Sequence, residues 1–361
     1  NFMWKINNLF SIVAVCILSF SCKKNVDIQI DTLSKSGEEF YFGEKVPVWA
    51  GTTGDKQDIT YQWSATGGTF DGFRTQHLFE NLWIAPNTPG EYTVTATAKS
   101  DGSTSSKSTV MKVTRYFFDE FQSVYTLNGN GWSLSNVATA GQKLVTDVDP
   151  ANSRLELTAT SGSTPNIRRS LNISDLKIPF SIRAKLGWKS FFRSGQAIAV
   201  SLYFVQPTDP TIPYIREIRW EIFPTANPAT TDNYQIRYET FIPASNTSKF
   251  SSDTSVLPAA LPLITPTKGK KANFAMANGN VKNLSLSVDA DNVFHAYVDG
   301  ELWFTSNGIK DWLAYAKTTY PGFPDPVAKE FRVSFPGKSG STGTTLFLKS
   351  VYINNDGTIL K

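Results

Sequence analysis

Short segments in which apolar and polar residues alternate recur along most of this chain. In the segment 90–98, alternate residues from Tyr92 to Ala98 are apolar and would share one face of a strand. Similar segments follow at intervals of roughly ten residues, separated by Gly, Pro, Asn and Asp. Apolar spacing typical of a helix is confined to residues 309–317 and, more weakly, 72–81. The pattern therefore predicts an all-β protein of antiparallel sheets.

The predicted strands form two groups that meet near residues 115 and 116. The first group occupies residues 29–115 and contains the segments 46–50, 59–65, 90–98 and 108–114. The second group occupies residues 116–361 and contains the segments 155–159, 180–186, 197–205, 215–223, 234–241, 284–288, 294–298, 302–304, 330–335 and 346–353. Because helices do not separate these strands, a parallel βαβ sheet is excluded. We expect a small sandwich followed by a larger jelly roll.

The first 28 residues follow a different pattern. Lys5 precedes an apolar run from Leu9 to Phe20, which ends at Ser21 and Cys22 and is followed by two lysines. The run is about half as long as a helix that crosses a bilayer. A basic residue, a short apolar run and small residues are typical of a cleaved signal peptide. We expect residues 1–21 to be that peptide and residues 22–28 to be a short tether.

The residues Leu18-Ser19-Phe20-Ser21-Cys22 resemble the lipobox of bacterial lipoproteins. The resemblance implies that the Cys22 thiol is acylated and that Cys22 becomes the N-terminus of a lipid-anchored protein. The alternative is an ordinary secretory peptide that is cut nearby, with Cys22 as a free thiol.

Composition narrows the function further. The chain has 35 Lys and Arg against 31 Asp and Glu, and the basic residues are scattered, which argues against a nucleic-acid partner. Its two cysteines are Cys16, inside the expected signal peptide, and Cys22, so stability must come from core burial. The two histidines, His77 and His295, offer little material for a histidine metal site or a Ser-His-Asp triad.

No organic cofactor is expected, because no Gly-rich phosphate loop precedes a helix. Structural calcium remains an alternative. The acidic clusters 147–149 and 289–292 could supply loop oxygens, although such clusters more often form turns.

The first group of strands resembles the polycystic-kidney-disease class of immunoglobulin-like domains. The resemblance rests on the segment Tyr61-Gln62-Trp63-Ser64-Ala65, on Trp83 to Pro86, and on the Pro-Gly turn that leads into the strand from Glu91. It implies that Trp63 and Trp83 pack in the core. Such domains usually act as spacers or weak binding modules.

The second group resembles the concanavalin A-like lectin and glucanase sandwiches, which include laminin G modules. The opening residues 118–121 precede Trp132, and a hairpin at 294–303 carries Asp299-Gly300 at its turn. The resemblance implies that the closing strand 346–353 pairs beside the first strand.

Within this second domain, Glu217-Ile218-Arg219-Trp220-Glu221 looks like the catalytic strand of family 16 glycoside hydrolases. In that family the first Glu attacks the anomeric carbon and the last protonates the leaving oxygen. On a strand, Glu217, Arg219 and Glu221 share one face. Here Arg219 replaces the family's Asp, and a guanidinium between two carboxylates favours their ionised forms. Because retaining hydrolysis needs one protonated carboxyl, we predict a non-catalytic polar patch that binds sugar hydroxyls.

Aromatic residues supply a second set of candidates. Trp312, Tyr315 and Tyr320 could stack on sugar rings, or the first two could cap the core from a short helix. Trp188 is a third possibility, with a core role as the alternative.

Taken together, a lipid anchor, an immunoglobulin-like spacer and a lectin-like sandwich resemble the surface glycan-binding lipoproteins of Bacteroidota polysaccharide-utilisation systems. The resemblance implies an outer-membrane protein at the cell surface, whose only membrane contact is its lipid anchor. It would capture a polysaccharide or oligosaccharide and present it to a TonB-dependent transporter and that transporter's partner lipoprotein. The alternatives are a glycoside hydrolase or lyase that uses Glu217 and Glu221, and a protein-binding adhesin.

Overall fold

The computed structural model describes residues 27–54, 58–71, 78–121, 131–146, 149, 152–159, 164–173, 175–189, 197–223, 233–250, 267–269, 281–335 and 344–359. The chain forms two compact units, with the boundary between Lys112 and Val113. Residues 1–21 and Cys22 lie outside the described residues, so their roles stay predictions. Among the helices in the described ranges, none is long and apolar enough to cross a membrane.

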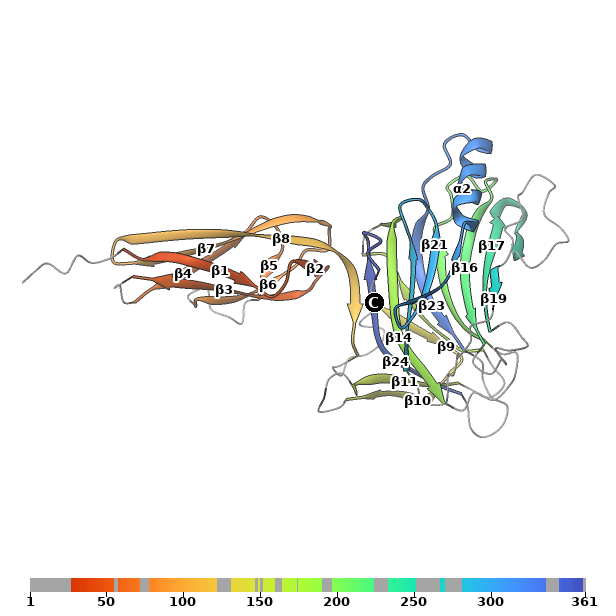
Figure 1. The fold of residues 1–361 in the computed structure, drawn as a ribbon, viewed down its shortest axis with the longest axis horizontal. Helices are drawn as coiled ribbons and strands as arrows, with labels where there is room; N and C mark the ends of the chain where they lie inside the picture. The colour runs from red at the N-terminus through yellow and green to blue at the C-terminus, as the bar shows by residue number, and fades with distance from the viewer. Residues whose placement is uncertain are drawn as a thin grey trace, which may run out of the picture. The chain divides into compact units, whose positions relative to one another are not determined.

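The first unit is a sandwich of two antiparallel sheets (Figure 1). One sheet has the order β1 (Gln29–Lys35), β3 (Lys45–Thr53), β6 (Glu80–Ile84) and β5 (Thr69–Phe70). The other contains β4 (Thr60–Ala65), β7 (Gly90–Ser100), the first part of β8 (Ser103–Asp119) and β2 (Glu39–Tyr41). This arrangement is the two-sheet sandwich that the alternating pattern predicts, and it agrees with the resemblance to immunoglobulin-like domains.

Two tryptophans occupy the core of the first unit, as the sequence predicts. Trp83 is fully buried and Trp63 is nearly so. Each indole N–H donates to a backbone carbonyl at 3.0 Å, Trp63 to Leu78 and Trp83 to Gly67. Because these hydrogen bonds satisfy the polar edge of each ring, both indoles can be buried without an unpaired donor.

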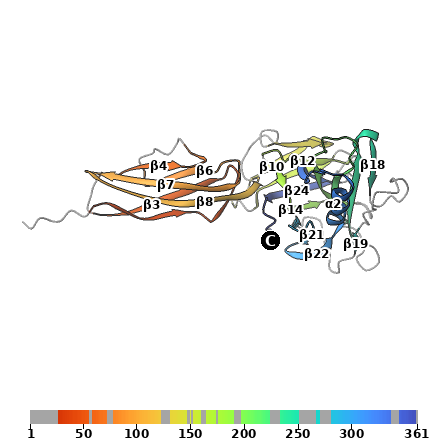
Figure 2. The ribbon, with the colours of Figure 1, turned by 90° about the horizontal axis from the view of Figure 1, so that it is seen from above.

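The second unit is a larger jelly roll of two antiparallel sheets (Figures 1 and 2). The first sheet has the order β22 (Glu301–Ser306), β21 (Phe294–Val298), β20 (Val281–Val288), β14 (Phe180–Lys189) and β24 (Thr345–Asn354). Strand β24 also pairs with the end of β8 and with β11 (Arg154–Ala159), and β11 pairs with β10 (Val137–Val145). The second sheet runs β18 (Thr247–Phe250), β17 (Tyr234–Ile242), β16 (Tyr214–Ile222), β15 (Ile198–Phe204), β23 (Val327–Ser334), β12 (Asn166–Ser170) and β9 (Trp132–Ser135). β13 (Leu176–Lys177) also pairs with β23, and β19 (Thr267–Gly269) with β17. The predicted all-β class is confirmed.

Apolar side chains of the two sheets meet in the core of the second unit. The rings of Tyr234 and Phe304, one from each sheet, stack with centroids 4.8 Å apart. The buried Tyr238 hydroxyl donates to Ser306 Oγ at 2.7 Å, which joins β17 to β22. These contacts hold the second sheet in place, so that its other face can carry polar groups.

Three sequence predictions about local structure are confirmed. β24 pairs with the end of β8, with Val351 opposite Asp119. Asp299 and Gly300 both have positive φ, at 49° and 81°, as a two-residue type I′ hairpin turn requires. The predicted helix at 309–317 is α2 (Gly308–Thr319).

The weaker helix prediction at 72–81 is wrong at its end, because residues 80 and 81 open strand β6. Residues 72–77 lie outside the described part of the chain. A short 3₁₀ turn, η3 (Pro243–Ser245), follows strand β17.

Candidate functional site

Strand β16 carries apolar and polar residues on opposite faces. Ile218, Trp220 and Ile222 are buried toward the core, and Glu217 and Arg219 alternate with them on the other face together with Glu221. The predicted common face of the three charged residues is therefore present in the structure. A strand period of two residues is the physical reason, and it needs no tertiary contact.

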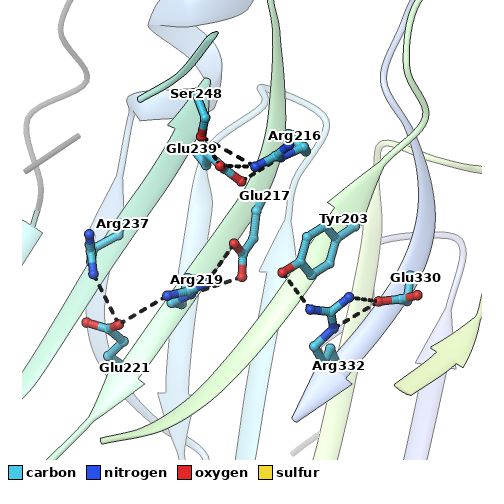
Figure 3. Close-up of polar contacts among 10 residues, drawn as sticks. All are labelled: Tyr203, Arg216, Glu217, Arg219, Glu221, Arg237, Glu239, Ser248, Glu330 and Arg332. Atoms are coloured by element: carbon cyan, nitrogen blue, oxygen red, sulfur yellow. Dashed lines mark hydrogen bonds and ion pairs between the residues drawn. The ribbon is translucent and has the colours of Figure 1, made fainter. Parts of the chain in front are cut away.

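Neighbouring strands extend this face. Pairing places Glu239 opposite Glu217 and Arg237 opposite Arg219 on β17, and Tyr203 opposite Glu217 on β15. On the next strand, β23, Glu330 is paired with Tyr203. We call the resulting set the polar face (Figure 3); it consists of Tyr203, Arg216, Glu217, Arg219, Glu221, Arg237, Glu239, Ser248, Glu330 and Arg332.

The most buried ion pair of the polar face joins Glu217 and Arg219. The guanidinium donates from Nε and Nη2 to the two carboxylate oxygens, each at 3.0 Å. The Glu217 side chain is only 2 % exposed, whereas Arg219 is 28 % exposed. Burial opposes the charge on Arg219, but the hydrogen bonds and charge of Glu217 outweigh it and raise the Arg219 pKa. The two hydrogen bonds thus hold both side chains in one orientation.

Glu221 lies between two arginines. Its Oε1 is 3.5 Å from Arg237 Nη1 and 3.9 Å from Arg219 Nη1. Arg219 therefore contacts both carboxylates that the sequence singles out (Figure 3). The guanidinium between two carboxylates, which the sequence predicts from the replacement of Asp, is observed.

A second buried carboxylate, Glu239, is held by Arg216 and Ser248. Arg216 Nε donates to Glu239 Oε2 at 2.7 Å, and Ser248 Oγ bonds the other carboxylate oxygen. The pairing of β16 with β17 shifts between Ile215 and Glu217, and this irregularity lets Arg216 join the polar face. The hydrogen bond that Arg216 donates to Glu239 is the main reason that the Arg216 pKa lies above its ordinary value.

Tyr203 joins the third ion pair of the polar face. Arg332 Nε and Nη2 donate to Glu330 Oε1 at 3.0 and 2.6 Å, and Arg332 Nη1 donates to the Tyr203 hydroxyl at 3.0 Å. The guanidinium carbon lies 4.3 Å from the centre of the Tyr203 ring. Burial, and then the nearby negative charge of Glu217, raise the pKa of Tyr203 to about 12.

This raised pKa gives a test of the polar face in alkali. The folded protein favours the neutral phenol, so Tyr203 contributes stability below pH 10 that is lost as the pH rises toward 12. We expect the free-energy difference of unfolding between the wild type and Tyr203→Phe to fall across that window. Urea unfolding of both proteins at a series of pH values measures it. Parallel stability curves would contradict the placement of Tyr203.

The polar face presents hydrogen-bond donors to solvent. Its four arginine side chains are 23–33 % exposed, whereas the glutamates that hold them are 2–18 % exposed. A ligand on this face would therefore meet guanidinium N–H groups fixed by carboxylates behind them. Because four glutamates match four arginines, the face attracts no polyanion by net charge. Such donors suit oxygen acceptors, including sugar hydroxyls and ring oxygens.

Glu217 and Glu221 have different surroundings from the pair of carboxyls that retaining glycoside hydrolysis uses. That reaction requires one carboxylate free to attack and one carboxyl that stays protonated near neutral pH. The Glu217 side chain is nearly inaccessible, and it accepts two hydrogen bonds from Arg219 and one from the Tyr203 hydroxyl. Glu221 lies against two guanidinium groups.

The aromatic candidates lie outside the polar face. Trp188 and Trp312 are each 1 % exposed, so neither ring has a free side on which a sugar could stack, and the core alternative describes their positions. Tyr315 and Tyr320 are half-buried; the rings of Trp312, Tyr315 and Tyr320 pack in series, with centroids 5.7 and 6.4 Å apart. The apolar surfaces of these rings hold α2 in place by packing. The loop-like composition of the segment does not indicate this role.

Sequence reasoning missed most of the polar face. Tyr203, Arg237, Glu239 and Arg332 were not among the candidates, although polar residues alternate along both β17 and β23. The repeated Glu-x-Arg spacing, present at 217–219 and again at 330–332, is a signal that could have found the ion pair of Glu330 and Arg332.

The acidic cluster 289–292 forms a turn. Asp289 Oδ1 accepts the backbone N–H groups of Asp291 and Val293, each at 2.9 Å, and Oδ2 lies 2.8 Å from His295 Nε2. Within the described ranges, no group of three His, Cys, Asp or Glu residues is arranged to hold a metal ion. Asp147 lies outside those ranges.

Comparison with protein-family models and with curated proteins finds no match. Similar solved structures include a GH16 protein of a Bacteroides ovatus mixed linkage glucan PUL, with a TM-score of 0.41 and 15% identity over 66% of this chain and 99% of that one. β-Agarase A from Zobellia galactanivorans has a TM-score of 0.40 and 11% identity, over 65% of this chain and 88% of that one. The carbohydrate recognition domain of Emp47p has a TM-score of 0.35 and 12% identity, over 63% of this chain and 89% of that one. All three are carbohydrate-recognition or carbohydrate-processing proteins, and the likeness is weak.

Proposed function

We propose that this protein binds glycan without cleaving it, and that the polar face of the second unit is the binding surface. The observation that carries the proposal is the set of partly exposed arginines, each fixed by a more deeply buried glutamate. Donors that are already oriented lose little conformational entropy when a ligand arrives. A sugar offers several oxygen acceptors at close spacing, which matches donors distributed along adjacent strands.

The finer part of the proposal concerns location and partners. A lipid anchor at Cys22 would hold the protein in the outer membrane, at the cell surface, with the immunoglobulin-like unit between the anchor and the glycan-binding unit. The captured polysaccharide or oligosaccharide would then pass to a TonB-dependent transporter and its partner lipoprotein. The signal-peptide pattern and the order of the two sandwiches support this proposal. Loss of lipid labelling in Cys22→Ser, together with protease accessibility on intact cells, tests it.

Binding is tested by affinity electrophoresis against neutral and uronic-acid polysaccharides. We expect the wild type to be retarded by at least one of them, and the double variant Arg237→Gln/Arg332→Gln to bind about tenfold more weakly, because it loses several charge-assisted donors. Arg154→Gln is the matched control, because Arg154 pairs with Glu156 at 2.8 Å in the same i, i+2 arrangement but on the other sheet. It should bind like the wild type.

Two outcomes would overturn the proposal. One is that none of the polysaccharides retards the wild type. The other is equal weakening by the double variant and by Arg154→Gln. Release of reducing ends from a bound polysaccharide that disappears in Glu217→Gln would establish a hydrolase instead.

A further inference from the structure

Four arginines follow a line across the second sheet of the second unit. Cross-strand pairing places Arg168 of β12 opposite Arg332 of β23, and Arg219 of β16 opposite Arg237 of β17. Ser201 of β15 lies between the two pairs, opposite both Arg332 and Arg219. Residues that lie directly opposite each other share one face of a sheet. We call these four arginines the arginine row; it adds Arg168 to the three members that Figure 3 shows.

The arginine row is unfavourable for the sheet itself. Like charges that lie directly opposite each other on neighbouring strands destabilise a sheet. Part of this cost is offset by three glutamates of the polar face, which are Glu217, Glu221 and Glu330. Glu239 is paired instead with Arg216, which lies outside the row. Four guanidinium groups thus share three carboxylates, and a local rule that is broken in this way is typical of a functional site.

The excess positive charge of the row lies at Arg168. This side chain is exposed and alternates with the fully buried Ile167. Its Nε donates to Ser133 Oγ at 2.9 Å, and no ion pair between described residues involves it. On the adjacent strand, Arg332 is 24 % exposed and is held by Glu330 and Tyr203. Two oriented guanidinium groups therefore lie side by side, and one of them lacks a counter-charge from the described part of the chain.

An oxyanion is the ligand that suits this pair of arginines. A carboxylate or a sulfate has at least two oxygen acceptors, so it can accept charge-assisted hydrogen bonds from both guanidinium groups. A neutral hydroxyl would leave the excess charge in place. Adjacent strands are about 4.8 Å apart, and a sugar unit of an extended polysaccharide spans a similar distance. A chain that lies across the strands can therefore present its acidic groups to the row.

We infer that Arg168 and Arg332 form a subsite for the acidic group of a charged polysaccharide, whose chain follows the arginine row. This inference rests on the proposed glycan-binding function and specifies the class of ligand. The ten residues of the polar face are balanced in charge, so the preference for an acid arises from the addition of Arg168. The acidic group is either the carboxylate of a uronic acid or a sulfate ester, because both offer the same charged oxygen acceptors.

Matched polymers separate these two sources. Calorimetric titration of the purified protein compares alginate and polygalacturonate with their neutral esters, and λ-carrageenan with its desulfated form. The titrations are made at about 0.15 M salt, which screens long-range attraction between exposed charges. We expect at least one acidic polymer to bind about tenfold more tightly than its neutral counterpart. A preference confined to the first two pairs identifies a carboxylate, and one confined to the third pair identifies a sulfate.

The same titrations can refute the acidic subsite. Equal binding within every pair, or no binding of any acidic polymer, would do so. If a neutral polysaccharide still retards the wild type in affinity electrophoresis, the proposed glycan-binding function stands although the subsite fails. If no polysaccharide of either kind binds, both proposals fail.

Variants locate the subsite. Arg168→Gln should weaken binding of the preferred acidic polymer about tenfold and remove most of its advantage over the neutral form. The side chain is exposed, so the substitution leaves the core intact. Arg154→Gln removes the same charge from the other sheet and should bind like the wild type. Unchanged affinity in Arg168→Gln, or equal weakening in both variants, would refute the assignment.

Discussion

Replacing Arg219 with methionine is expected to lower the free energy of unfolding of the second unit by about 3 kcal/mol at neutral pH. The substitution keeps an unbranched apolar side chain but removes both hydrogen bonds to Glu217. The Glu217 carboxylate is almost completely buried, so it would lose the guanidinium that compensates its charge. Urea unfolding monitored by tryptophan fluorescence measures the loss.

The charge on Glu217 can be separated from the packing of Arg219. The double variant Glu217→Gln/Arg219→Met should recover much of the lost stability, because a neutral amide replaces the unpaired charge. A deficit that persists in the double variant would contradict the role of the ion pair.

Replacing Asp119 with alanine should destabilise the second unit by a similar amount, about 3 kcal/mol. Asp119 Oδ2 accepts the Trp132 indole N–H and Oδ1 accepts the Phe121 backbone N–H, both at 2.9 Å. Trp132 and Phe121 are each 1 % exposed, so neither donor could turn to water. Two buried donors would therefore lose their acceptor at the start of the jelly roll.

Asp119→Asn should be milder, because its amide oxygen still accepts one of the two hydrogen bonds. Asp209→Ala is the control. Like Asp119, Asp209 accepts a hydrogen bond from the backbone N–H two positions later, that of Thr211, at 2.9 Å, but it lies on an exposed loop. Thermal unfolding of the three variants provides the comparison. Equal effects of Asp119→Ala and Asp209→Ala would show that burial of the Asp119 network contributes little.

The Asp119 network shows how far sequence reasoning reaches. The residues 118–121 and Trp132 are recognisable as family-like features of the opening strand. The hydrogen bond between Trp132 and Asp119 cannot be recognised from the sequence, because it depends on how β8 and β9 approach each other. The family resemblance therefore identified Asp119 and Trp132 as features of the opening strand. Only the packed structure shows that the Asp119 carboxylate accepts hydrogen bonds from two donors.

The aromatic candidates show the opposite case. Trp312 and Tyr320 stand in a segment whose composition suits a sugar-binding loop, and the same residues can seat a short amphipathic helix. Local sequence does not distinguish these alternatives, because in both of them aromatic residues alternate with polar ones. Burial of Trp312 against β15 and β16 decides between them.

What the sequence determined by itself is local. The two-residue period of a strand places Glu217, Arg219 and Glu221 on one face, and the Asp299-Gly300 turn pairs its two strands, because both follow from backbone geometry over a few residues. The tertiary structure decided which strands lie beside β16, and so brought Tyr203, Arg237, Glu239 and Arg332 into one polar face. It also buried Trp188 and Trp312. These outcomes depend on contacts between residues far apart in the chain, which a local pattern of polar and apolar positions does not specify.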